Sequence, residues 1–182
     1  MSRKYKFHNK EGIYFVSFAV VYWIDLFIRE AYSNTIVESL KYCIENKGME
    51  LYCWCVMPSH LHLIFRAKDN NPDVLLGRFK EFTSKQLVAQ IKESNEESRK
   101  EWMIWMFERA ASKSSNVKGT QLWQHHNKPI EIWSDEVLRQ KLEYIHNNPV
   151  ASGFVSSPDF WKYSSAIDYS GGKGLIEICH AI

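Results

Sequence analysis

The spacing of hydrophobic positions predicts a strand and then a helix near the start of the chain. Residues 13–22 (IYFVSFAVVY) are rich in β-branched and aromatic side chains, which is typical of a strand. Residues 33–47 predict a helix that stops at Gly48, because apolar residues recur on one face. That face consists of Ile36, Val37, Leu40 and Ile44.

The middle of the chain predicts a hairpin and a second long helix. Residues 50–57 and 61–66 have strand composition, and a short Pro-Ser turn joins them. An Asn-Pro-Asp sequence at 71–73 opens a helix of about 20 residues. The polar stretch 93–101 is a loop or a helix end, and residues 102–111 predict a further helix.

The last third predicts one more strand and one more helix. A fourth strand lies within residues 121–133, after a flexible connector at 112–120, and Pro129 limits its extent. Ser134 is a suitable N-cap for a helix that ends near Pro149, because a proline disfavours helical geometry at the preceding residue. The buried face of this helix would be Leu138, Leu142 and Ile145.

The predicted order is β-α-β-β-α-β followed by a further helix. This order indicates an α+β fold of the ferredoxin-like type, in which an antiparallel sheet carries helices on one face. The length of 182 residues fits a single domain over residues 1–182. We expect its core at about 13–150 and an irregular tail at 151–182.

Composition is compatible with a nucleic-acid partner but does not require one. The net charge is +2 and the pI is near 8.3, whereas DNA-binding domains often exceed a pI of ~9. Basic residues recur at the N-terminus and on the predicted second helix: Arg3, Lys4, Lys6, Lys10, Arg78, Lys80, Lys85 and Lys92. The aromatic content of 14% fits either core packing or rings on which bases stack.

The cysteines and the absence of long apolar runs indicate the compartment. Cys53 and Cys55 form a C-x-C pair on a predicted strand, and with Cys43 and Cys179 they do not complete a structural zinc site. We therefore expect small core thiols. Acidic residues interrupt the apolar start of the chain, and no run of about 20 apolar residues follows. We expect a cytoplasmic protein without membrane contact.

Two histidines at the start of the third predicted strand are candidate metal ligands. Side chains alternate between the faces of a strand, so His60 and His62 share one face with Ile64. The other face would be Leu61, Leu63 and Phe65, which suit the core. Imidazole is a common metal ligand, and a structural role for the pair is the equal alternative.

Tyr144 and Asn148 lie one turn apart on the flank of the last predicted helix. Taken singly, the tyrosine would be a boundary residue and the asparagine a cap before the proline. His146 lies about 160° from Tyr144 on the helical wheel, so it does not belong to the same site.

Together these motifs resemble a known family. Residues 56–64 (VMPSHLHLI) resemble the His-hydrophobic-His motif of the single-tyrosine HUH transposases. Residues 144–150 (YIHNNPV), followed by 153–155 (GFV), resemble the catalytic-tyrosine helix of one branch, the REP-associated tyrosine transposases. Residues 78–85 and 161–165 also resemble family segments, so the resemblance covers about residues 13–170.

The resemblance implies a DNA strand-transfer site. Tyr144 would attack a phosphate and form a 5′-phosphotyrosine link, while His60, His62 and Asn148 hold a divalent ion. Family members use Mg²⁺ or Mn²⁺, although two imidazoles would also accept zinc. Many members carry glutamine where this chain has Asn148, and asparagine offers the same amide oxygen on a shorter arm.

The implied partner is single-stranded or hairpin DNA, bound by a monomer or a homodimer. Arg78, Lys80 and Lys85 are candidate phosphate contacts, followed by Arg3 and Lys4. One alternative is a domesticated hairpin-binding protein with weak or lost cleavage. Another is an unrelated metal-binding α+β protein in which Tyr144 is only structural.

Overall fold

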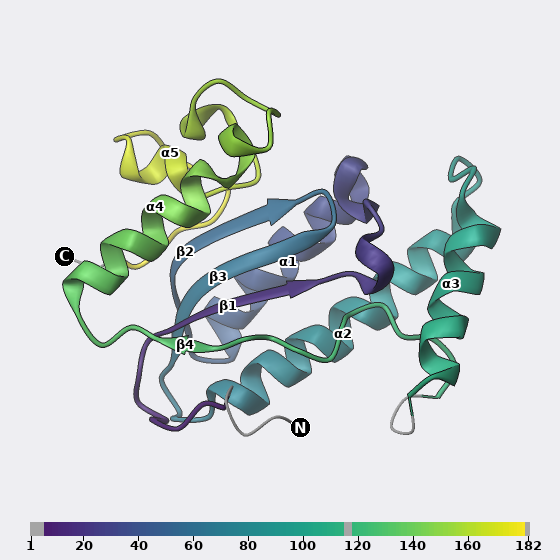
Figure 1. The fold of residues 1–182 in the computed structure, drawn as a ribbon, viewed down its shortest axis with the longest axis horizontal. Helices are drawn as coiled ribbons and strands as arrows, with labels where there is room; N and C mark the ends of the chain where they lie inside the picture. The colour runs from purple at the N-terminus through teal and green to yellow at the C-terminus, as the bar shows by residue number, and fades with distance from the viewer. Residues whose placement is uncertain (1–5, 115–117, 181–182) are drawn as a thin grey trace.

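The computed structural model describes residues 6–114 and 118–180 and has a four-stranded antiparallel sheet at its centre (Figure 1). The strands are β1 (Tyr14–Ala19), β2 (Met49–Met57), β3 (His60–Ala67) and β4 (Ile130–Glu131), in the spatial order β2-β3-β1-β4. This is the order of a ferredoxin-like sheet, which confirms the predicted α+β class.

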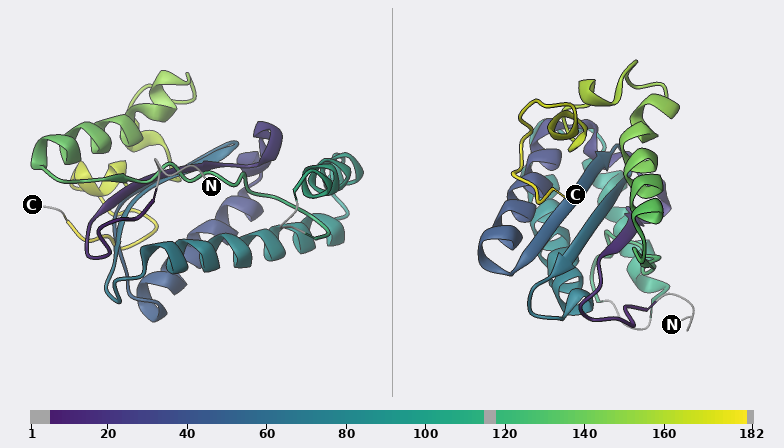
Figure 2. Two further views of the ribbon diagram at one scale, coloured as in Figure 1. Left: turned by 60° about the horizontal axis from the view of Figure 1, so that its bottom comes forward. Right: turned by 90° about the vertical axis from the view of Figure 1, so that its left-hand side faces the viewer.

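Helices cover both faces of the sheet. Helices α1 (Glu30–Asn46) and α2 (Pro72–Glu93) lie on one face, and α4 (Asp135–Ala151) lies on the other (Figure 2). The alternation of side chains along the strands separates two cores: Val16, Leu61, Leu63 and Phe65 pack toward α1 and α2, whereas Phe15, Cys53, Cys55 and Ile64 pack toward α4 through Ile145. The predicted two-faced third strand is therefore confirmed.

A further helix extends from one end of the molecule. Helix α3 (Lys100–Ser112) follows a loop after α2 and lies at the opposite end of the molecule from α4 (Figure 1). It buries Met103, Phe107 and Ala110 and contacts the short 3₁₀ turn η1 (Val21–Trp23) that follows β1. A second 3₁₀ turn, η2 (Leu26–Ile28), leads into α1.

Some element boundaries differ from the prediction. Strand β1 ends at Ala19 because the chain turns into η1, where Tyr22 and Trp23 have positive φ angles. Strand β4 has only two residues, since the chain beside Pro129 pairs with β1 only briefly. Helix α4 continues through Pro149 to Ala151, because a proline in the last turn removes a single helical hydrogen bond.

The C-terminal tail is attached to the sheet. It contains the 3₁₀ turn η3 (Pro158–Phe160) and the short helix α5 (Ala166–Tyr169). The Val56 amide donates to Tyr163 O at 2.8 Å, and the Cys179 amide donates to Leu51 O at 2.8 Å. The tail thereby covers the exposed edge of β2, which the irregular composition of 151–182 did not predict. Among the helices described, none is long and apolar enough to span a bilayer.

Candidate active site

His60 and His62 lie side by side at the start of β3, on the sheet face that α4 covers. Their ring centroids are 4.8 Å apart, and the Ser59 hydroxyl lies 3.2 Å from Nδ1 of His60. His62 is buried and stacks on Phe15 of the neighbouring strand, with ring centroids 5.9 Å apart. The two rings of the predicted H-x-H pair are therefore neighbours on the same face of the sheet.

Burial keeps both imidazoles neutral at physiological pH. It lowers the pKa of His60 to about 4, and it lowers that of His62 to about 3 with a smaller contribution from the neighbouring His60 charge. A neutral imidazole has a free lone pair, which is the form that binds a metal ion.

Helix α4 brings Tyr144 and Asn148 to the histidine pair. Ser134 caps the helix by accepting from the Val137 amide, and the fully buried Ile145 fixes its rotation against the sheet. The Tyr144 ring lies 5.3 Å from the His62 ring, and the tyrosine remains 49% exposed. One turn later, Asn148 Nδ2 lies 3.4 Å from His62 Nε2. The helix and the strand therefore form one site.

This group of residues fits a divalent ion. Rotating the Asn148 amide by half a turn would direct its oxygen toward the histidines, giving two nitrogens and one oxygen. Within the described part of the chain, no three His, Cys, Asp or Glu side chains cluster suitably for a metal, so a third protein ligand here would have to be the Asn148 amide. The buried Nδ1 of His62 has no hydrogen-bond partner among the described residues. The nitrogen that faces Asn148 is the other one, Nε2, so Nε2 is the His62 atom that would bind an ion shared with the amide.

Two neighbours of the site were missed by the sequence analysis. The Lys141 ammonium lies 5.9 Å from the centre of the Tyr144 ring and 5.2 Å from that of Phe15. The exposed Trp23 places its ring 5.4 Å from that of His60. Lys141 could have been found from its i, i+3 spacing to Tyr144, whereas the contact of Trp23 with His60 depends on the turn after β1.

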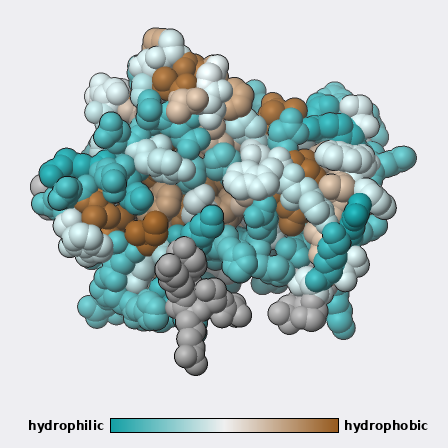
Figure 3. Space-filling view, viewed as in Figure 1, coloured by the Kyte–Doolittle hydropathy of each residue, from teal (hydrophilic) through white to brown (hydrophobic). Residues whose placement is uncertain are grey.

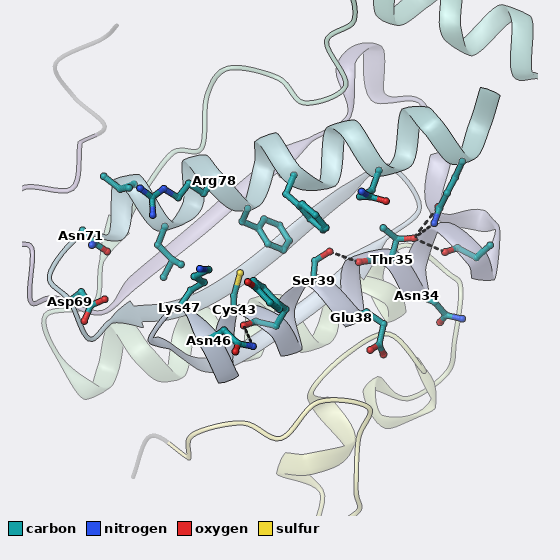
Figure 4. Close-up of a pocket in the computed structure, with 18 residues that line it drawn as sticks. Asn34, Thr35, Glu38, Ser39, Cys43, Asn46, Lys47, Asp69, Asn71 and Arg78 are labelled. Carbon is teal, nitrogen blue, oxygen red and sulfur yellow. Dashed lines mark hydrogen bonds between the residues drawn. The ribbon is translucent and has the colours of Figure 1, made fainter. Parts of the chain in front are cut away.

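The predicted phosphate contacts do not gather around this site. Arg78 lines a groove of about 1090 Å³ between α1 and α2, on the opposite face of the sheet from α4 (Figure 4). Lys85 is exposed and pairs with Glu81 on the same helix. Arg3 and Lys4 lie outside the described residues.

Lys80 points inward instead of toward solvent. Its ammonium donates to Gln124 O at 2.8 Å and to Asn127 Oδ1, and it lies 5.0 Å from the centre of the Phe18 ring. Burial lowers its pKa to about 7. Lys80 therefore holds the connector after α3 against the sheet, which makes it a poor phosphate contact.

His146 points away from Tyr144, as its position on the helical wheel predicted. Its Nε2 lies 2.9 Å from the Ser165 hydroxyl and 3.2 Å from Cys53 Sγ, so it links α4 to the tail. Burial lowers its pKa to about 4. Cys43, Cys53 and Cys55 are buried free thiols, as expected, and Cys179 is exposed.

Comparison with known families gives a match to the part of the chain that runs from β1 into α3. The sequence profile described as "Transposase IS200 like" matches residues 13–109, which is more than half of the 182 residues. The chain belongs to the IS200-like transposases. The matched part includes His60 and His62, whereas Tyr144 and Asn148 lie beyond it.

Longer similarities extend over the tyrosine helix. This member of the IS200-like family is 24% identical to a protein of Haemophilus influenzae that is named as a REP-associated tyrosine transposase, over 167 residues that cover 91% of this chain and 85% of the relative. A solved structure of a REP-associated tyrosine transposase bound to a REP hairpin is similar in fold, with a TM-score of 0.58 and 17% identity. That match covers 100% of this chain and 94% of the other.

Proposed function

We propose that this IS200-like transposase cleaves and rejoins single-stranded or hairpin DNA through a covalent bond to Tyr144. The observation that carries the proposal is the position of the tyrosine. Its partly exposed ring lies 5.3 Å from the buried His62, with Asn148 one turn away. A tyrosine that only marks the boundary of a helix would not be expected to lie beside two neutral histidines and an amide.

His60, His62 and Asn148 would hold the divalent ion, which we propose to be Mg²⁺ or Mn²⁺. When bound, the ion would neutralise negative charge that develops on a phosphate oxygen. The low pKa values of the two histidines favour this role, because neither must lose a proton before it binds the metal near neutral pH.

In the cleavage step the Tyr144 oxygen attacks phosphorus, and the bond between phosphorus and the 3′ oxygen of the preceding nucleotide breaks. The phenol loses its proton, the departing oxygen gains one, and the strand ends as a 3′-hydroxyl and a 5′-phosphotyrosine. A free tyrosine hydroxyl has a pKa of ~10, so it needs assistance near neutral pH. The Lys141 ammonium, 5.9 Å from the centre of the Tyr144 ring, would stabilise negative charge on the tyrosine. Attack by a 3′-hydroxyl on the phosphotyrosine reverses the step and joins strands.

The proposed substrate is a hairpin with an adjoining single strand. Support comes from the similar fold of a protein solved with a REP hairpin and from the relative named for REP association. The exposure of Tyr144 agrees with a substrate as large as a DNA strand, because the nucleophile is open to solvent on one side.

The proposal is tested by incubating the protein with labelled hairpin DNA and Mn²⁺ and then running a denaturing gel. We expect a protein–DNA adduct that disappears with a chelator and in Tyr144→Phe. If the protein bound the hairpin but formed no adduct, the proposed cleavage would be wrong and the protein would be a hairpin-binding protein. If the protein did not bind DNA at all, the alternative of a metal-binding protein in which Tyr144 is only structural would stand.

A further inference from the structure

Helix α3 carries a row of exposed aromatic and basic side chains that its packing does not require. At about 100° per residue, these side chains fall within about 80° of the helix circumference. They are Trp102, Trp105, Arg109 and Lys113, and all four are exposed. The buried side of the same helix is formed by other residues, including Met103 and Phe107. What distinguishes these rings from the other exposed ones is that they share one helix face with two cations.

The row leads to the candidate active site. The Lys113 ammonium lies 5.7 Å from the centre of the Tyr22 ring, and Tyr22 precedes Trp23, whose ring is 5.4 Å from that of His60. At the outer end, the Arg109 guanidinium lies 5.3 Å from the centre of the Trp105 ring. Exposed rings and cations therefore follow one another from α3 to the histidine pair. We call this series the α3 track; it consists of Trp102, Trp105, Arg109, Lys113, Tyr22 and Trp23.

The turn η1, which carries Tyr22 and Trp23 at the inner end of the track, has an unusual backbone conformation. Tyr22 and Trp23 have φ angles of 56° and 57°, in the left-handed region that disfavours residues other than glycine. The turn is fixed by hydrogen bonds from the Val21 amide to Leu122 O at 2.8 Å and from the Trp23 amide to Val20 O at 3.0 Å. The turn thus holds the Trp23 ring beside His60 and the Tyr22 ring beside Lys113.

We infer that the α3 track binds a single-stranded DNA extension of the hairpin and guides it to Tyr144; this inference rests on the proposed function. Bases of any sequence stack on exposed aromatic rings, and interleaved cations contact the phosphates. The track spans about 16 Å along α3 alone, at about 1.5 Å per residue. Glu101 and Glu108 flank it on the Trp105 side, so the phosphates would follow the side of Arg109 and Lys113.

The character of the surface favours nucleic acid over a protein partner. The face seen in Figure 3 carries several small hydrophobic patches among hydrophilic side chains. The track itself mixes rings with positive charges and continues into the site where a DNA strand would react. A second protein copy on α3 remains a distinct outcome of the test below.

The first experiment compares a blunt hairpin with the same hairpin carrying a 5′ or a 3′ single-stranded tail, by fluorescence anisotropy. We expect one tail to tighten wild-type binding, and Trp102→Ala/Trp105→Ala to lose about tenfold or more in affinity for that tailed DNA only. Trp105→Phe keeps a stacking face and should retain most of the affinity. Phe82→Ala is the matched control, because Phe82 is 53% exposed on α2 and Trp105 is 52% exposed.

The second experiment measures the dependence of tailed-hairpin affinity on salt concentration. Arg109→Ala/Lys113→Ala should reduce the slope of log affinity against log salt by about 0.7 for each phosphate that the variant no longer neutralises. Lys85→Ala removes an exposed basic residue of α2 and should leave the slope unchanged.

Three results would overturn the inference while leaving the proposed function standing. All three assume that the wild-type protein forms the adduct. In the first, neither tail increases the affinity for the hairpin; in the second, Trp102→Ala/Trp105→Ala binds tailed DNA as tightly as wild type. In the third, sedimentation shows that this variant only converts a dimer to a monomer. An absent adduct together with normal tail-dependent binding would instead overturn cleavage and leave the α3 track as a DNA-binding surface. No DNA binding by wild type would overturn both.

Discussion

Asn148 is the residue on which the proposed metal site most depends, because the histidine pair alone offers only two ligands. Its amide nitrogen lies 3.4 Å from His62 Nε2. We expect Asn148→Ala to weaken Mn²⁺ binding by about tenfold or more, measured by calorimetry. Asn148→Gln is the matched control, since it keeps the amide on a longer arm and should retain part of the affinity. Equal Mn²⁺ affinity in wild type and Asn148→Ala would remove Asn148 from the site.

Lys141 is expected to act on the tyrosine and not on the metal. Its ammonium faces the Tyr144 ring, so Lys141→Ala should slow adduct formation several-fold at neutral pH because a stabilising positive charge is removed. Lys141→Arg should keep most of the rate, and both variants should bind Mn²⁺ as wild type does. Adduct formation at the wild-type rate in Lys141→Ala would show that the cation has no part in the chemistry.

Residues within one element were predictable from the sequence, and contacts between elements were not. The period of two along β3 placed His60 and His62 on one face, and the period of the helix placed Tyr144 and Asn148 together. Trp23 was missed because its contact with His60 depends on a turn with positive φ angles. Lys80 was misjudged because a lysine that binds backbone and amide oxygens has the same sequence signal as a solvated one.

At the scale of elements, the position of α4 on the sheet sets the distance between nucleophile and histidines. Ile145 is fully buried where α4 meets the sheet, so Ile145→Ala should lower the free energy of unfolding by about 2–4 kcal/mol. It should also reduce the adduct rate of the folded protein, because the rotation of α4 becomes less fixed.

Leu40→Ala provides the matched control for this prediction. Leu40 is equally buried, but it lies on α1 at the other face of the sheet. Urea unfolding should show a similar loss of stability in both variants, with the adduct rate reduced only in Ile145→Ala. If Ile145→Ala and Leu40→Ala formed the adduct at equal rates per folded molecule, contacts other than that of Ile145 would position α4.

The order and type of the elements followed from the sequence, and several of their ends did not. The two hairpin strands and the long α2 have strong periodicity, and they were predicted within a few residues. The continuation of α4 past Pro149 and the docking of the tail on β2 depend on tertiary contacts. Sequence periodicity carries no information on such contacts.

At the scale of the whole molecule, the sheet divides structural and chemical roles between its faces. The face under α1 and α2 holds the larger apolar core, whereas the face under α4 holds the buried His62 and the half-buried His60. The ferredoxin-like order was predictable because it needs only the sequence of elements. That α4 covers the second face was not, because the direction of a helix after a two-residue strand is set by packing.

Neutral histidines that are buried or half-buried should make the stability of the whole molecule sensitive to acid. Burial lowers the pKa of His146 to about 4, as it does for the histidine pair, whereas histidine in an unfolded chain titrates near ~6.5. The unfolded chain therefore takes up protons first as pH falls. This stability is fully present above pH ~6.5 and is lost between about 6.5 and 4.

His146 tests this pH dependence without disturbing the candidate ligands. We expect His146→Gln to lose less stability than wild type between pH 7 and pH 5, measured by urea unfolding. His126→Gln changes an exposed histidine of the connector and should follow the wild-type curve. Parallel curves for wild type and His146→Gln would contradict the burial of a neutral His146.

The central claim is that Tyr144 is the residue that becomes bonded to DNA. The most direct measurement is mass spectrometry of the adduct after digestion with protease and nuclease. We expect a nucleotide attached through its 5′ phosphate to the α4 peptide at Tyr144. The same nucleotide on another residue, or an adduct of unchanged yield in Tyr144→Phe, would contradict it.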